Sequence, residues 1–157
     1  MEKLNHWLSL IANLGVILGI VFLAVEIQQN TNALRAQTRD SISHRQVEWF
    51  TNIGSNQYAA ATLQKGSRST DPLELNDAQS LSFMFLVQSN MRMWENEYYQ
   101  YKIGLFDDKE FEPRLERWKF ITRAPGRREV WQSVRSGYSP DFRALMDEMH
   151  GYEPVTD

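Results

Sequence analysis

The sequence contains no cysteine and few residues that interrupt helices. Its 157 residues include five prolines and eight glycines. Disulfides and thiolate chemistry are therefore excluded, although the lack of cysteine fits a reducing compartment and a disulfide-free periplasm equally well. No segment shows the alternating apolar pattern of a strand bounded by turn residues. We therefore predict an all-α fold.

The residue patterns of catalytic and metal sites are also lacking. Three histidines, His6, His44 and His150, are far apart in the sequence, so we expect solvent or interface histidines and no metal site. No GxSxG motif, HExxH motif or glycine-rich phosphate loop occurs. Glu95 and Glu97 point to different sides of a helix, which makes them a poor acid–base pair, and we expect Glu95 to form a structural ion pair with an arginine. The sequence thus predicts a non-enzymatic protein without a cofactor, and an enzyme with an unrecognised site is a minor alternative.

A long apolar run, Leu8–Val25, stands out against an otherwise polar chain. At about 1.5 Å per residue, roughly 20 apolar residues cross the hydrocarbon core of a bilayer. Trp7 lies where an interfacial aromatic residue is expected, and Glu26 closes the far side. We predict a transmembrane anchor over residues 1–27.

Three other interpretations of this run are less favoured. A signal peptide would have only Lys3 in its basic region, and cleavage after Ala24 would place the bulky Phe22 at position −3. A core helix of a soluble protein does not need an uncharged run of this length. An interfacial helix would need a charged face, which this segment lacks.

Small and weakly polar side chains gather on one side of the predicted transmembrane helix. Small residues allow close approach of helix backbones, and Ser or Asn can bond across the contact. Glycine is also common in membrane helices generally. We predict a helix-association face and a homo-oligomer, with this face formed by Ser9, Ala12, Asn13, Gly15, Val16 and Gly19.

An alternative function is a homo-oligomeric pore formed by a ring of the N-terminal helices. Its polar contributors would be Asn5, Ser9, Asn13 and Glu26, because polar groups within a membrane face a cavity or a partner. Between Asn13 and Glu26, however, the same stripe is apolar, and a dry constriction is expected there.

The distribution of basic residues predicts the orientation of the anchor. Lys3 is the one basic side chain before the run, whereas Arg35, Arg39 and Arg45 follow it closely. The positive-inside rule then places the following domain in the cytoplasm. The predicted location is the cytoplasmic (inner) membrane, with a single span.

The remaining chain is expected to form a cytoplasmic helical domain over residues 28–150, followed by a loose tail over 151–157. Residues 28–65 predict a long helix continuing from the span, with Gly66 after its end and a possible break at Asn30–Asn32. Asn76 with Gln79 predicts a capping box. An apolar seam with alternating spacings of three and four follows, comprising Met84, Val87, Met91, Trp94, Tyr98 and Tyr101.

Three or four further helices complete the predicted bundle. Gly104 ends the helix that carries the seam, and Asp107 with Glu110 caps the next, in which Pro113 predicts a bend or a split. A break at 124–126 precedes a short helix over 127–135. Ser139 followed by proline opens the last helix, which Gly151 closes.

Basic residues concentrate between residues 114 and 143, although the net charge of the chain is −3. A surface facing anionic lipid or a protein partner is one interpretation. Nucleic-acid binding is disfavoured. The favoured interpretation is structural, with Trp118 and Trp131 in the core and the arginines paired with the acidic helix. The candidate basic surface comprises Arg114, Arg117, Lys119, Arg123, Arg127 and Arg128.

Short motifs along most of the chain resemble a family of bacterial single-span membrane-anchored helical proteins. The main one is the run Glu-Ile-Gln-Gln-Asn-Thr over residues 26–31, at the end of the apolar helix and before an Ala- and Arg-rich segment. Further matches are Lys65-Gly66, Trp94-Glu95, Pro125-Gly126 and Trp131. The resemblance implies a single-span helical protein of a bacterial cytoplasmic membrane. It implies no activity and no functional residues.

Overall fold

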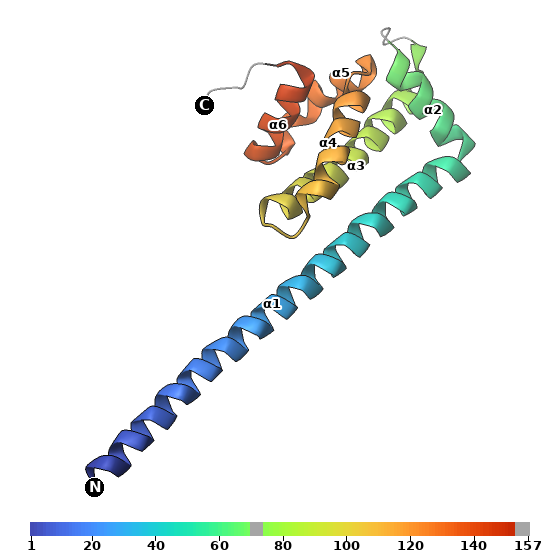
Figure 1. Cartoon of the computed structure of the whole chain (residues 1–157). Coiled ribbons are helices and arrows are strands. Elements are labelled where there is room, and N and C mark those ends of the chain that lie inside the picture. The colour runs from blue at the N-terminus through green and yellow to red at the C-terminus, as the bar shows by residue number, and fades with distance from the viewer. Residues whose placement is uncertain (70–73, 153–157) are drawn as a thin grey trace. The chain divides into compact units, whose positions relative to one another are not determined.

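The computed structural model describes residues 1–69 and 74–152, and these residues form helices joined by short turns without a strand. The all-α prediction is therefore confirmed for the described residues (Figure 1). The chain divides into two compact units, Met1–Thr38 and Arg39–Asp157. The helices are α1 (Glu2–Ser55), α2 (Gln57–Arg68), α3 (Asp77–Lys102), α4 (Asp108–Thr122), α5 (Pro125–Val134), η2 (Arg135–Gly137) and α6 (Pro140–His150).

Helix α1 is continuous from Glu2 to Ser55. The possible break at Asn30–Asn32 does not occur, because the helix runs through these residues. Instead, the Gln28 amide donates to Oδ1 of Asn32 at 3.3 Å, one turn further along the helix. Among the residues that the structure describes, α1 is the one helix long and apolar enough to cross a membrane.

Helix α1 ends before the position that the sequence predicts. Asn56 has an extended backbone, and its side chain accepts a hydrogen bond from the Ala59 N–H at 3.0 Å, so it caps α2. The unbroken helix to Lys65, with Gly66 just after its end, was therefore wrong. Gly66 lies inside α2 and is buried against the Phe83 ring of α3.

Most of the other predicted helix ends are confirmed. Asn76 and Gln79 form both hydrogen bonds of a capping box. Gly104 and Gly151 adopt positive φ angles of 76° and 70°, which favour glycine at these helix ends. The Asp107 side chain caps α4 by accepting from the Lys109 N–H at 2.9 Å.

Two proline positions differ from the prediction. Pro113 lies within α4 and does not split it. Helix α5 begins at Pro125, two residues earlier than predicted, because proline at the first helical position needs no hydrogen-bonded N–H. Pro140 takes the same position in α6, as predicted after Ser139.

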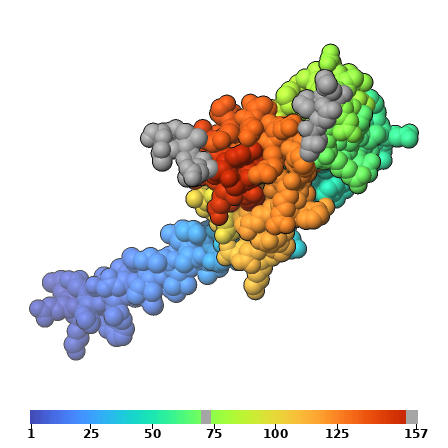
Figure 2. Space-filling view, turned by 90° about the horizontal axis from the view of Figure 1, so that it is seen from above, coloured from blue at the N-terminus to red at the C-terminus, as the bar shows by residue number. Residues whose placement is uncertain are grey.

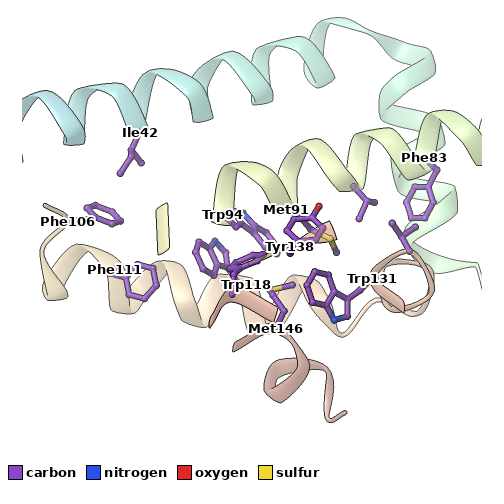
Figure 3. Packing of buried hydrophobic residues seen from close by; sticks show 13 residues of the cluster. Ile42, Phe83, Met91, Trp94, Phe106, Phe111, Trp118, Trp131, Tyr138 and Met146 are labelled. Carbon is purple, nitrogen blue, oxygen red and sulfur yellow. The ribbon is translucent and has the colours of Figure 1, made fainter. Parts of the chain in front are cut away.

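Aromatic and methionine side chains form the core of the Arg39–Asp157 unit (Figure 3). The predicted seam on α3 faces this core, with Val87, Met91 and Trp94 fully or almost fully buried. The Trp94 ring stacks on Trp118 of α4 with centroids 5.1 Å apart. Trp131 is completely buried, which confirms that both predicted core tryptophans, Trp118 and Trp131, are internal.

The predicted loose tail is described only at its start. Tyr152 is partly buried against the core, and its N–H donates to the Asp147 carbonyl at 2.8 Å. Residues 153–157 lie outside the described residues. Tyr152 therefore packs against the second compact unit.

Candidate functional site

The predicted helix-association face lies entirely within the first compact unit. All six of its residues are exposed on α1. A Cβ atom added to Gly15 or Gly19 would meet no other atom within 4 Å, so this side of the helix is open to a second backbone. The large apolar side chains from Trp7 to Ile27 are 50% to 66% exposed.

The predicted basic surface does not form a single face. Lys119 pairs with Glu116 on the same helix at 2.8 Å. Arg123 is exposed, and Arg128 reaches the His150 carbonyl of α6. Figure 2 shows α4, α5 and α6, in orange to red, packed together.

Arg127 is buried, so its assignment to the basic surface was wrong. Its exposed fraction is 6%, because α5 packs against α2 and α3 on this side. Its Nη1 donates to Oδ1 of Asn90 on α3 at 3.1 Å. Burial lowers the pKa of Arg127 to about 10, well above neutral pH, so its side chain is a charged group inside the domain.

The two glutamates of α3 have separate roles, as their spacing predicts. Glu95 accepts from Arg92 at 2.6 Å and from the Ser139 N–H at 2.8 Å, which confirms a structural ion pair. Burial alone would raise the pKa of Glu95, but these two partners lower it below its usual value. The Ser139 contact also fixes the start of α6.

Glu97 is more buried than Glu95, at 1% exposed, and no sequence pattern indicates this difference. Gln46 of α1 donates to its Oε1 at 2.6 Å, and Arg114 of α4 lies 3.7 Å from Oε2. Burial raises the pKa of Glu97 more than Arg114 and Gln46 lower it. The arginine pairing predicted for the acidic helix thus occurs at Glu97, between three helices.

His150 is also buried, at 2% exposed, so the expectation of a solvent or interface histidine was wrong for this residue. Its ring stacks on Trp131 with centroids 6.0 Å apart. Burial and the neighbouring Arg128 lower the pKa of His150 to about 4. His6 and His44 are exposed, as predicted.

A pocket of about 290 Å³ opens within the Arg39–Asp157 unit, beside the Trp94–Trp118 stack. Three helices each supply residues spaced by three or four positions, so each presents one face to the pocket. Its walls are mainly aromatic and apolar, and its charged lining residues are three arginines. The lining comprises Gln46, Trp49, Phe50, Leu63, Asn90, Met93, Trp94, Arg114, Arg117, Trp118, Ile121 and Arg127.

Sequence reasoning found the arginines of this pocket but not the pocket. Arg114 and Arg117 are one turn apart on α4, whereas Arg127 follows a turn and a new helix. Their shared position depends on how α4 and α5 pack, which no local pattern indicates. In the sequence, Arg114 and Trp118 are four residues apart. This spacing places an arginine and an aromatic residue of the pocket on the same face of α4.

Comparisons of this chain with protein-family models, with curated proteins and with solved structures give no match. The resemblance to a family of single-span bacterial proteins therefore stays an expectation based on short motifs. A function is inferred below from the residues and contacts of the chain itself.

Proposed function

We propose that this protein is a non-enzymatic, membrane-anchored helical module that self-associates through its N-terminal helix and presents its second compact unit to another protein. The observation that carries the proposal is the exposure of the apolar part of α1. Every large apolar side chain from Trp7 to Ile27 is at least half exposed. Removing one such side chain from water is favourable by about 1.5–3 kcal/mol. Lipid around this part of α1 would provide that stabilisation.

The charges flanking the apolar segment support one orientation. Lys3 precedes it, and Arg35, Arg39 and Arg45 follow it. The positive-inside rule then favours the second unit on the cytoplasmic side of an inner membrane. Zero cysteines are compatible with this location.

The association face supports self-assembly within the bilayer. Hydrocarbon gives no hydrophobic driving force between helices, so close backbone packing and polar contacts decide whether they associate. Gly15 and Gly19 provide open space on one side, and Ser9 and Asn13 provide hydrogen-bonding groups near it. A second copy of α1 fits this face.

The mass of the full-length protein in lipid nanodiscs tests the proposal. We expect a dimer or a higher oligomer, and we expect Gly15→Leu with Gly19→Leu to reduce it to a monomer, because leucine separates the backbones. The matched control, Ile17→Leu with Val21→Leu on the opposite face, keeps the oligomer. A monomeric wild-type protein, or an oligomer unaffected by the glycine substitutions, contradicts self-association through this face.

A flux assay separates the module from the alternative pore. The stripe between Asn13 and Glu26 contains Val16, Gly19 and Leu23, so a ring of these helices would have a dry constriction. We therefore expect liposomes containing the oligomer to show no ion flux above that of empty liposomes. Sustained conductance would favour the pore.

A further inference from the structure

The Arg127 guanidinium lies inside the domain with one neutral partner. Its Nη1 bonds to Oδ1 of Asn90, and none of the ion pairs formed within residues 1–69 and 74–152 includes Arg127. Burying a charge without an opposite charge is costly. A neutral side chain could donate the same hydrogen bond from α5 to Asn90. The positive charge of Arg127 therefore needs another explanation.

The pocket beside Arg127 provides that explanation. Arg117 also lines it, and the contact found for Arg117 in the described part of the chain is with the Phe120 ring, 5.4 Å from the guanidinium carbon. Arg114 is partly neutralised by Glu97 at 3.7 Å. Among the residues that the structure describes, no carboxylate lines the pocket. Its net charge is therefore positive, and it attracts a negatively charged group.

The other walls indicate what accompanies the negative group. Trp94 and Trp118 are stacked with their ring planes 18° apart, and both contribute to the lining. Leu63, Met93 and Ile121 add apolar surface. Pockets with apolar walls and a few charged groups bind small molecules that combine an apolar body with one polar end.

We propose that this pocket binds a small organic carboxylate with a flat apolar body, and that Arg127 and Arg117 bind the carboxylate. The planar guanidinium matches a carboxylate through two parallel hydrogen bonds. A single negative charge is favoured over a double one, because the Glu97 carboxylate lies behind Arg114. The site lies within the second compact unit and does not depend on the membrane anchor or on self-association.

Benzoate and benzamide provide a matched pair of probes, because they have the same shape and differ in charge. Titration of the full-length protein in nanodiscs, followed by tryptophan fluorescence and calorimetry, should show saturable binding of benzoate and none of benzamide. Phenyl phosphate should bind more weakly than benzoate. Equal binding of benzamide, tighter binding of phenyl phosphate, or no saturable binding of benzoate overturns the assignment.

Variants locate the binding at this pocket. Arg117→Gln, at an exposed position, should weaken benzoate binding about tenfold or more, since hydrogen bonds to charged groups are among the strongest in proteins. Arg123→Gln removes the same charge from an exposed residue that does not line the pocket, and binding should be unchanged. Equal affinities of the two variants would place the ligand elsewhere and overturn the proposal.

Arg127→Met distinguishes a binding role from a structural one. Methionine has a similar length and no charge, so benzoate binding should be lost. The unfolding temperature of the ligand-free protein should change little, because removal of an unpaired buried charge offsets the lost hydrogen bond to Asn90. A lower unfolding temperature with benzoate binding retained would show that Arg127 is structural and overturn its role. If this variant does not fold, the comparison of Arg117→Gln with Arg123→Gln still decides the proposal.

Discussion

Two buried titratable side chains make the stability of the second compact unit depend on pH in opposite directions. His150 has a pKa lowered from 6.5 to about 4 by burial and by Arg128. The unfolded chain then binds a proton at pH values where the folded chain does not, so stability falls as pH falls from about 6.5 to 4. Burial raises the pKa of Glu97 above 4.5, so the folded chain holds this proton more tightly than the unfolded chain does. The contribution of Glu97 to stability therefore falls as pH rises above 4.5.

We predict that His150→Phe and Glu97→Gln change the pH dependence with opposite signs. Phenylalanine keeps the ring stack on Trp131 and removes the titration, so the variant should gain stability relative to wild type as pH falls from 6.5 to 4, by up to roughly 3 kcal/mol. The Glu97→Gln variant should gain stability relative to wild type as pH rises above 4.5. Urea unfolding at several pH values, followed by tryptophan fluorescence, measures both differences.

The opposite signs provide the internal control for this prediction. A His150→Phe curve parallel to wild type between pH 4 and 6.5 would show that His150 is not protected from protons in the folded state. A Glu97→Gln curve that loses stability with rising pH would show that the Glu97 carboxylate is better stabilised when folded than when unfolded.

At the scale of elements, helices α2 and α5 approach each other through two glycines. A Cβ atom on Gly126 would collide with the backbone carbonyl of Gly66, and one on Gly66 would lie 2.5 Å from the Phe83 ring. A backbone atom cannot move aside as a side-chain end can. The contact between α2 and α5 therefore requires glycine at position 126.

Gly126→Ala should destabilise the protein by about 3 kcal/mol, because overpacking at a backbone contact forces the two helices apart. Gly54 is the matched position, since a Cβ atom there would meet no atom within 4 Å. Gly54→Ala should be neutral or stabilising by up to about 1 kcal/mol, because alanine favours helix more than glycine does. Thermal unfolding of both variants tests this, and similar unfolding temperatures would contradict the close approach of α2 and α5.

At the scale of the whole molecule, α1 belongs to both compact units and its chemistry changes along its length. Its first half contains the run Leu8–Val25, which has no charged side chain and suits hydrocarbon. Its second half has one buried apolar residue, Ile42, and polar contacts to the second unit through Gln46. In the proposed membrane-anchored module, the first part of this regular helix would contact lipid and the second part would contact water and the second unit.

We predict that Leu18→Arg prevents stable membrane insertion, whereas Val47→Arg does not. The two residues are similarly exposed on α1, at 60% and 62%, and only Leu18 lies in the apolar run. Arginine near the middle of a span is less favourable than leucine by about 3 kcal/mol. Alkaline extraction of membranes from expressing cells measures the difference. Release of both variants, or of neither, would contradict a span at Leu8–Val25.

The sequence by itself determined the helical fold class, the apolar segment and most helix ends. These features depend on local chemistry: caps at Asn76 and Asp107, positive φ at Gly104 and Gly151, and proline at the first position of α6. The seam on α3 was also predictable, because a helix repeats its faces every three to four residues. The end of α1 at Ser55 was not, since Asn56 is equally compatible with a helix interior and a cap.

Only the tertiary structure decided which polar residues are buried. Arg127 and Arg128 are neighbours of the same type, yet Arg127 is internal and Arg128 is exposed. Glu97, rather than Glu95, is the buried glutamate of α3, and the His150 ring is buried against Trp131. Burial depends on which other helices cover a side chain, and that packing joins residues far apart in the sequence. The arginine-lined pocket exists for the same reason, because residues from α1, α2, α3, α4 and α5 meet around it.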